Sequence, residues 1–360
     1  MNRIGAQVLI VGAGPAGLSA ALAASEQVEV TLVDDNPDPG GQIWRAERGK
    51  ITSTDAAKLF GAIDSGRVTI LSGTSVFAAV SPNRLIATTE GGTVELQFEK
   101  LIIATGARER FVPFPGWILP NVFGAGGLQA LVKGGVNVSG KRVVVAGTGP
   151  LLLAVADYLK VKGAEVLLIA EQARAMRINR FAFGLWRNPG KIAQAVRLRS
   201  RLFGTPYLTD CWITKAIGED KIERVELTRK GKKWRVECDF VACGFHLVPS
   251  TELAAMLGCE INNGSVVVDY VQRTTIKNVY CAGEPTGVGG VEASLIEGKI
   301  AGYAATGQIT KAEQHITNRA KAHRFATALN TAFALRDELK SLVDNDTVVC
   351  RCEDVDYGRL

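Results

Sequence analysis

The chain has 360 residues, with 47% hydrophobic and 22% charged residues and a formal net charge of +6. This composition is typical of a globular protein and excludes a disordered one, and the length suggests about two domains. The basic residues are scattered, and their densest cluster, residues 229–233, has the sequence of a solvated hairpin turn. We therefore expect no nucleic-acid partner.

No uninterrupted apolar run reaches the ~18 residues that a membrane span needs. The apolar start of the chain is not expected to be a signal peptide, because three glycines and a proline interrupt it at nucleotide-loop spacing. Five of the seven cysteines lie singly in apolar or strand-like stretches: Cys211, Cys238, Cys243, Cys259 and Cys281. This usage predicts a reduced, cytoplasmic protein without a disulfide framework.

The first motif joins an apolar strand at residues 8–11 to the sequence G-x-G-x-x-G, formed by Gly12, Gly14 and Gly17. Gly12 allows a tight turn, Gly14 lets a pyrophosphate approach the backbone, and Gly17 lets the next helix pack closely on the strand. That helix offers unpaired N–H groups and a partial positive charge to phosphates. The predicted pyrophosphate-binding residues are these glycines together with Pro15 and Ala16.

A second strand, residues 28–33, ends in Asp34, 22 positions after Gly12 and near the roughly 20 expected for the acid that holds a ribose hydroxyl. The loop that follows leaves the nucleotide-binding edge of the sheet, and its glycine pair permits close backbone approach. We expect cofactor contacts both from this loop and from the slim turn that ends the strand at residues 100–103: Asp35, Gly41, Gln42, Ala104, Thr105 and Gly106.

Between the loop after Asp34 and the turn at residues 104–106, the sequence predicts a surface helix at residues 51–60 and a small antiparallel insert. The insert is expected to contain strands at residues 68–71, 75–80, 85–89 and 94–98.

The opening pattern recurs near residue 141, where a strand leads into Gly147 and Gly149 and then into a helix. Such a duplication predicts a second Rossmann-like unit. Its third glycine is replaced by Leu152, which we expect to push the helix off the strand and narrow the phosphate approach. The strand that follows ends in Glu171, which suits NAD, whereas Arg174 and Arg177 suit NADP. A nicotinamide nucleotide site and a scaffold without one are both open, and Leu152 favours the scaffold.

The remaining chain carries two ambiguous features and one informative element. Residues 180–203 are basic and predicted to be helical from Lys191, either as a partner surface or as an exposed helical face. His246 lies nearest to a plausible cleft, with a structural or a catalytic role, and no residue stands out as a general acid or base. The strand at residues 279–282 leads through Gly283, Glu284 and Gly290 into a helix, where Glu284 can accept hydrogen bonds from a polyol.

Four separated elements resemble the two-dinucleotide-domain flavoproteins of the glutathione and thioredoxin reductase type: residues 12–17 with Asp34, 40–42, 104–106 and 283–284. This resemblance implies an α/β fold of two Rossmann-like domains, with FAD bound by residues 1–110 and 270–308 and an NAD(P)-binding-like domain inserted at 111–269. A helical segment, 309–342, and a partial module, 343–360, follow. The resemblance places pyrophosphate on the first glycines, ribose on Asp34, and ribitol or flavin phosphate near Glu284, where the family usually has Asp. Because no C-x-x-C occurs, disulfide-reductase chemistry is not expected.

Residues 39–45, 147–153 and 282–287 are more specifically similar to the larger subunit of opine oxidases and to hydrogen cyanide synthase and hydroxyproline dehydrogenase subunits. That similarity implies a hetero-oligomer in which a partner flavoprotein oxidises a small amino or imino acid and passes electrons to this FAD-dependent subunit. The alternatives are a stand-alone NAD(P)H-dependent flavin reductase and a non-catalytic scaffold subunit.

The C-terminal residues Cys350 and Cys352 resemble the start of a ferredoxin-like 2Fe–2S module. Such a cluster needs four thiolates, and only two are present before Leu360. We therefore expect either a truncated chain or a partner that supplies the remaining ligands, and the alternative is that these are two unrelated surface cysteines.

Overall fold

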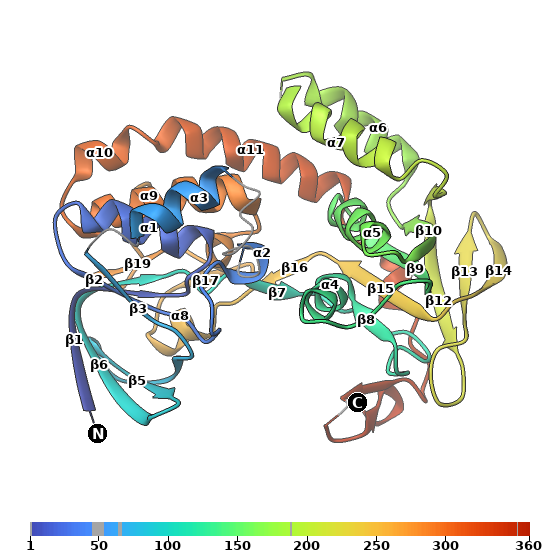
Figure 1. The fold of residues 1–360 in the computed structure, drawn as a ribbon, viewed down its shortest axis with the longest axis horizontal. Coiled ribbons are helices and arrows are strands. Elements are labelled where there is room, and N and C mark those ends of the chain that lie inside the picture. Colours follow the sequence, from blue (N-terminus) through green and yellow to red (C-terminus); the bar gives the residue numbers. More distant parts are fainter. Residues whose placement is uncertain (1, 45–53, 64–66, 188, 351) are drawn as a thin grey trace. The chain divides into compact units, whose positions relative to one another are not determined.

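The computed structural model describes residues 2–44, 54–63, 67–187, 189–350 and 352–360 (Figure 1). The chain forms two compact units, Met1–Arg108 with Leu247–Thr327, and Glu109–His246 with Ala328–Leu360. The first unit resumes earlier than the expected residue 270 and extends beyond residue 308. The second unit includes the last 33 residues of the chain (328–360).

The first unit is built on a largely parallel sheet in the order β3-β2-β1-β6-β5-β4, with β19 also paired to β6. Strands β1, β2, β3, β6 and β19 run parallel to their neighbours in this group, whereas β4 and β5 form an antiparallel extension. The strands are β1 (Asn2–Val11), β2 (Val30–Val33), β3 (Val68–Leu71), β4 (Ser75–Ser81), β5 (Arg84–Thr89), β6 (Gly92–Ile103) and β19 (Val279–Cys281).

Two details of the predicted antiparallel insert are wrong. Strand β3 is a parallel edge strand of the main sheet, paired with β2. The runs at 94–98 and 100–103 form one strand, β6, because both runs pair with β1 while the first half of the strand pairs with β5. The predicted helix at residues 51–60 is seen as α3 (Thr54–Ile63), and residues 51–53 lie outside the described residues, as does Arg45.

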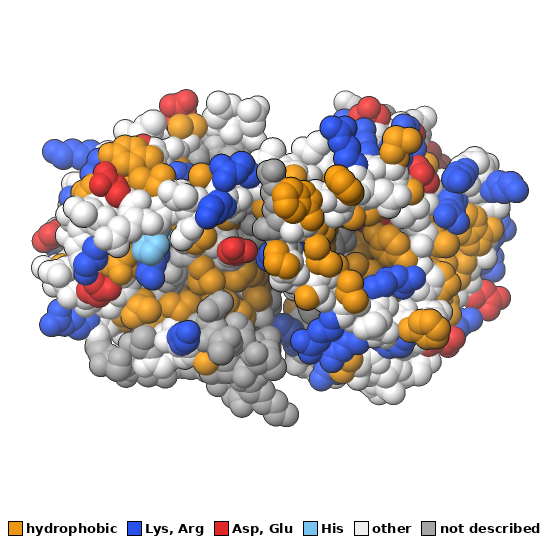
Figure 2. Space-filling view, turned by 90° about the horizontal axis from the view of Figure 1, so that it is seen from above, with side chains coloured by type: hydrophobic (Ala, Val, Ile, Leu, Met, Phe, Trp, Pro, Cys, Tyr) orange, Lys and Arg blue, Asp and Glu red, His pale blue; other side chains and the backbone are white. Residues whose placement is uncertain are grey.

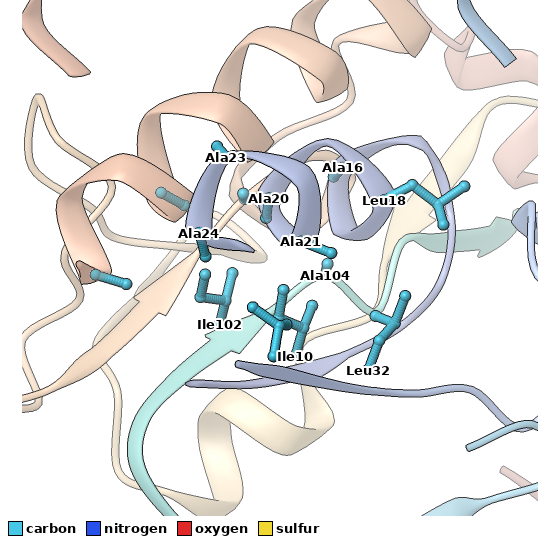
Figure 3. Close-up of a cluster of buried hydrophobic side chains, with 14 of the residues drawn as sticks. Ile10, Ala16, Leu18, Ala20, Ala21, Ala23, Ala24, Leu32, Ile102 and Ala104 are labelled. Carbon is cyan, nitrogen blue, oxygen red and sulfur yellow. The ribbon is translucent and has the colours of Figure 1, made fainter. Parts of the chain in front are cut away.

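Helix α1 (Pro15–Ser25) packs on this sheet and against α9 (Gly290–Ala305). The alanine side chains of α1 lie over Ile10, Leu32 and Ile102 (Figure 3). A Cβ added at Gly298 of α9 would lie 2.1 Å from the carbonyl oxygen of Ala16. Small side chains on both helices therefore allow a late segment of the chain to pack directly on its beginning.

The second unit contains a parallel sheet in the order β11-β10-β9-β15-β8 and an antiparallel sheet of β12, β13 and β14. Its strands are β8 (Val122–Gly124), β9 (Arg142–Thr148), β10 (Glu165–Glu171), β11 (Tyr207–Thr209), β12 (Cys211–Ile217), β13 (Arg224–Arg229), β14 (Lys232–Glu237) and β15 (Phe240–Phe245). The predicted hairpin turn at residues 229–233 is confirmed, with positive φ at Lys230 and Gly231.

Leu152 does not displace its helix in this unit. Helix α5 (Leu151–Val161) packs against β9, and Leu152 is fully buried in the core. Its Cδ2 atom lies 3.3 Å from the position that a Cβ would take at Gly244. The missing side chain at Gly244 thus provides the room that the usual third glycine would have left.

The remaining helices follow the expected helical segments only in part. Basic residues 180–203 form α6 (Ala175–Gly184), η1 (Leu185–Arg187) and α7 (Pro189–Arg201), and the first of these helices was not predicted. The segment expected at 309–342 is divided into α10 (Ile309–Glu313), α11 (Ile316–Ala332) and α12 (Asp337–Lys340). The other elements are α2 (Gly41–Trp44), β7 (Ala107–Glu109), α4 (Ala125–Lys133), β16 (Leu247–Pro249), α8 (Glu252–Met256), β17 (Ile261–Asn262), β18 (Ser265–Val266), η2 (Glu284–Thr286), β20 (Val348–Cys350), β21 (Val355–Asp356) and η3 (Tyr357–Arg359).

Helices α6 and α7 bury no side chain among the described residues. Met176, Phe183 and Trp186 are exposed there, and residues 172–209 contain no Asp or Glu. Figure 2 shows hydrophobic and basic side chains interspersed on the face of the second unit that carries these helices. In the described part of the chain, no helix is both long and apolar enough to cross a membrane.

Candidate cofactor site

The first glycine loop is shaped by two close backbone contacts and one open position. A Cβ at Gly12, whose φ is +106°, would lie 2.2 Å from the Ala104 carbonyl oxygen, and a Cβ at Gly17 would lie 1.8 Å from that of Gly12. The nearest atom to a Cβ at Gly14 is the Gly41 Cα, 4.0 Å away. Gly12 and Gly17 are therefore required by the fold, whereas the space beside Gly14 at the start of α1 is bounded by the bare backbone of Gly41.

Helix α1 presents an uncapped N-terminus beside this space. Gly14 is its N-cap, Pro15 and Ala16 begin its first turn, and no described side chain caps it. Gly41 lies directly against Gly14, since a Cβ at Gly41 would come within 2.9 Å of the Gly14 Cα. Gln42 follows at the start of α2. The structure thus brings together two segments that sequence analysis assigned to one site, and helix N–H groups there attract anionic groups.

Asp34 is buried and supports the glycine loop through its carboxylate. Oδ2 accepts a hydrogen bond from the Ala13 N–H at 2.5 Å, and Oδ1 accepts one from the Asn36 N–H at 2.8 Å. The next residue, Asp35, is exposed. Asp34 therefore positions the loop, and Asp35 is the acid on the surface at the end of β2.

The turn after β6 contributes small side chains and one hydroxyl, that of Thr105, which is already hydrogen-bonded within the chain. Ala104 donates its N–H to the Val11 carbonyl oxygen at 2.8 Å. Thr105 donates its hydroxyl to the Ser250 carbonyl oxygen at 2.7 Å, and Gly106 accepts a hydrogen bond from the Ser250 N–H at 3.0 Å. Ser250 had no sequence signal, because it comes from a loop 145 residues later in the chain than Thr105.

Glu284 provides a buried carboxylate oxygen that is not paired within the described chain. Its Oε1 accepts a hydrogen bond from the Gly290 N–H at 2.9 Å, whereas its Oε2 is buried without a described partner. Burial raises the pKa of Glu284. Gly283 lies against α1, since a Cβ there would lie 2.7 Å from the Ala16 Cβ. A buried acceptor of this kind beside the helix start fits a hydroxyl-bearing ligand.

Glu297 of α9 was missed as a functional residue, although it is an acid on a helix face of small residues. Only 1% of Glu297 is exposed, and its Oε2 accepts hydrogen bonds from the Gly283 N–H and the Thr286 hydroxyl, both at 2.9 Å. Its Oε1 lies 2.5 Å from His323 Nε2 and 3.3 Å from Arg319 Nε. Burial alone would raise the pKa of Glu297, but its hydrogen bond with His323 and the Arg319 charge lower it overall. This network holds the Gly283 turn.

The second glycine loop is also supported by an acid, Glu171. This acid binds the second glycine of its loop, whereas Asp34 binds the residue before the second glycine of the first loop. Glu171 is fully buried, and its Oε2 accepts a hydrogen bond from the Gly149 N–H at 2.7 Å. Its Oε1 accepts hydrogen bonds from the Thr148 hydroxyl and the Ala173 N–H, both at 2.8 Å. Burial raises the pKa of Glu171 to about 7.

The two C-terminal cysteines lie together at the surface. The Sγ atoms of Cys350 and Cys352 are 3.1 Å apart. Among the described residues, no group of three or more His, Cys, Asp or Glu side chains could hold a metal ion. These residues alone therefore do not complete an iron–sulfur site, which needs four ligands.

The paired Rossmann-type sheets and the first glycine loop define the class of protein. The pyridine nucleotide-disulphide oxidoreductase family matches residues 6–321, and the chain belongs to that family. It is an FAD-dependent oxidoreductase.

Comparison with individual proteins narrows this class. The chain is 30% identical to an opine oxidase subunit of Rhizobium meliloti over 98% of this chain and 74% of that protein. It is 28% identical to the hydrogen cyanide synthase subunit HcnB of Pseudomonas protegens over 96% of this chain and 81% of that protein. The resemblance inferred from sequence is thus confirmed.

Solved structures support the fold. L-proline dehydrogenase from P. horikoshii has a TM-score of 0.64 at 17% identity, covering 89% of this chain and 59% of that one. T. acidophilum thioredoxin reductase has a TM-score of 0.65 at 22% identity, covering 84% of this chain and 98% of that one.

Proposed function

We propose that this chain is the FAD-binding subunit of a hetero-oligomeric enzyme that oxidises a small amino or imino acid and passes the electrons to an acceptor. The observation that carries the proposal is the bare glycine backbone at Gly14, which is bordered by the uncapped start of α1 and by Gly41. The relatives described as opine oxidase and hydrogen cyanide synthase subunits support the substrate class and the hetero-oligomer.

The residues of the first unit fit FAD. Gly14 and the first turn of α1 would hold the diphosphate, because the backbone is bare and the helix N–H groups point to it. Asp34 would fix the loop, and because both of its carboxylate oxygens accept backbone hydrogen bonds, the ribose hydroxyl expected on Asp34 would be accepted by its exposed neighbour Asp35. The unpaired Oε2 of Glu284 would accept a hydroxyl of the ribityl chain. FAD supplies the capacity to accept a hydride and to release electrons.

The chain's own residues bind and orient in this mechanism, and we assign none of them as a general acid or base. The substrate would lose a hydride from its carbon next to nitrogen while it is bound to the partner flavoprotein. The exposed apolar and basic helices α6 and α7 are compatible with contact to another subunit. We also propose a cytoplasmic location, because the five buried cysteines are free thiols.

The Cys350 and Cys352 pair would contribute two of the four thiolates of a 2Fe–2S cluster, with the other two from outside residues 1–360. The 3.1 Å separation and surface position of the two Sγ atoms support this role. Iron and acid-labile sulfide measured in the chain alone and in its complex would test it. A complex without iron would contradict it.

The test of the proposed function is an absorbance spectrum of the purified chain after incubation with FAD, followed by anaerobic additions. We expect flavin bands that NADH leaves unchanged and that an amino or imino acid bleaches only when the partner subunit is present. Bleaching by NADH would favour a stand-alone flavin reductase. The lack of any flavin band would contradict the proposal and favour a scaffold subunit.

A further inference from the structure

Residues 328–336, which we call the C-terminal arm, lie on the second unit at the carboxyl end of its parallel sheet. Three neighbouring strands, β10, β9 and β15, end there at Glu171, Thr148 and Phe245. The strand order reverses at β9, since β10 lies on one side of it and β15 on the other. In open α/β sheets, nucleotides bind in the crevice at such a reversal.

The backbone of Phe333 is bound by side chains from the ends of two of these strands, β9 and β10. Its carbonyl oxygen accepts a hydrogen bond from the Thr148 hydroxyl at 3.1 Å and from Gln172 Nε2 at 3.5 Å. The arm therefore occupies the crevice itself.

The Phe333 side chain lies over the second glycine of the loop. A Cβ at Gly149 would have the Phe333 ring as its nearest neighbour, at 4.0 Å. The residue is 5% exposed, and its ring packs edge-on against Phe181, with ring centroids 5.8 Å apart. At the equivalent position of the first unit, the nearest atom to a Cβ at Gly14 is the Gly41 Cα, also 4.0 Å away, so bare backbone and not an aromatic ring lies where a diphosphate would approach.

Arg336 fixes the far end of the arm. Its backbone N–H donates to Gln172 Oε1 at 3.1 Å, and its guanidinium forms an ion pair with Asp210 at 2.7 Å. The guanidinium also stacks 4.4 Å from the centre of the Trp212 ring. Contacts at Phe333 and Arg336 thus attach this stretch to the same edge of the sheet.

The acids of the two units bind different N–H groups of their glycine loops, so the two loops present different groups to a diphosphate. Asp34 binds the residue between the first two glycines, Ala13, and leaves the Gly14 N–H to a ligand. Glu171 binds the N–H of the second glycine itself, Gly149. A diphosphate at the second loop would therefore meet a buried carboxyl group and the Phe333 carbonyl in place of free donors.

We propose that the second glycine loop is the binding site of the chain's own C-terminal arm, and that NADH and NADPH are not electron donors to this enzyme. This inference rests on the proposed function in one respect: the proposed function makes the chain a flavoprotein, to which NADH and NADPH could otherwise donate electrons. The contact between arm and loop does not depend on flavin.

The first test is a calorimetric titration of the full-length wild-type chain with ADP-ribose, NADH and NADPH, at saturating FAD so that the first glycine loop is occupied. We expect no binding with a Kd below about 1 mM, the upper end of ordinary substrate constants. Tighter binding of any of the three would overturn the proposal. A chain that binds no FAD would contradict the proposed function, and the exchange experiment below would still test the arm.

The second test is hydrogen–deuterium exchange of the arm in Arg336→Ala, with Lys340→Ala as a control, because Lys340 pairs with Asp337 at the surface. We expect exchange in residues 328–336 to rise at least about 10-fold in Arg336→Ala, the effect of losing a charge-assisted contact of about 1.5 kcal/mol, and to stay unchanged in the control. Phe333→Leu provides a milder variant if Arg336→Ala fails to fold. Unchanged exchange in a folded arm variant would overturn the proposal.

Discussion

The backbone N–H of Ala13 donates a hydrogen bond to the Asp34 carboxylate, with a nitrogen–oxygen distance of 2.5 Å. This contact joins the end of β2 to the first glycine loop across 21 positions in the sequence. It leaves the next residue, Gly14, facing the open start of α1. The geometry of the loop thus depends on a negative charge at position 34.

Asp34→Asn is expected to weaken FAD binding by at least about 10-fold, because a hydrogen bond to a charged group contributes about 1.5–3 kcal/mol. Titration of the apoprotein with FAD, followed by flavin fluorescence, measures the change. Asp38→Asn in the same loop is the control, since Asp38 is exposed. Equal affinities in the two variants would show that Asp34 does not support the loop.

Gly14→Ala and Gly17→Ala are expected to separate binding from folding. The Cβ at position 14 meets only the Gly41 Cα at 4.0 Å, so this variant should fold normally but lose FAD affinity by about 10-fold or more through a clash with the diphosphate. The Cβ at position 17 would lie 1.8 Å from the Gly12 carbonyl oxygen, so that variant should be destabilised. Thermal unfolding of both apoproteins, with FAD titration, checks this; a Gly14→Ala variant with full FAD affinity would contradict the assignment.

Glu171 is expected to make the second unit less stable as the pH rises. Its pKa is about 7 in the folded chain against an ordinary value of 4.5, so the folded state favours the protonated form. This stabilisation is complete below pH 4.5 and is lost as the pH rises through about 7. Glu171→Gln should remove about 3 kcal/mol of this pH dependence. Urea unfolding at several pH values, monitored by tryptophan fluorescence, gives the free energy of unfolding of both proteins. If the expectation is wrong, these free energies will change with pH in parallel.

Glu297→Ala is expected to destabilise the first unit by about 3–5 kcal/mol, because it leaves the Arg319 charge without its buried partner. His323→Gln should cost only about 1 kcal/mol, since the His323 side chain is 41% exposed. Urea unfolding of both variants gives these values. The same Glu297→Ala protein should bind FAD more weakly because Gly283 loses its support. Similar losses in the two variants would argue against a buried Arg319–Glu297 pair.

The pH dependence of the Glu297 network has the opposite sign to that of Glu171. The folded-state pKa of Glu297 lies below its ordinary value, so its contribution is present above that ordinary value and is lost as the pH falls through the folded-state pKa. Acid unfolding of wild type and Glu297→Gln compares this directly. The difference in stability between the wild type and Glu297→Gln should become smaller as the pH falls.

Local patterns predicted much of the fold because they act over short distances. The strand that leads into Gly12 and the turn at Lys230 and Gly231 follow from apolar runs and from residues that tolerate positive φ. The continuity of β6 could not be read in this way, because it depends on pairing with β1 from Val94 to Ile103. The burial of Leu152 depends on Gly244, which lies 92 positions later in the sequence.

By itself, the sequence determined the two Rossmann-like units, the family and the candidate cofactor residues, since glycine spacing and strand hydrophobicity are local properties of the chain. The tertiary structure decided which carboxylate supports which loop and which loop is left open. It showed Glu171 bound to Gly149 and the Phe333 carbonyl held by Thr148 and Gln172. Such contacts join residues 22 to 185 positions apart, and only the packing of the sheet brings them within hydrogen-bonding distance.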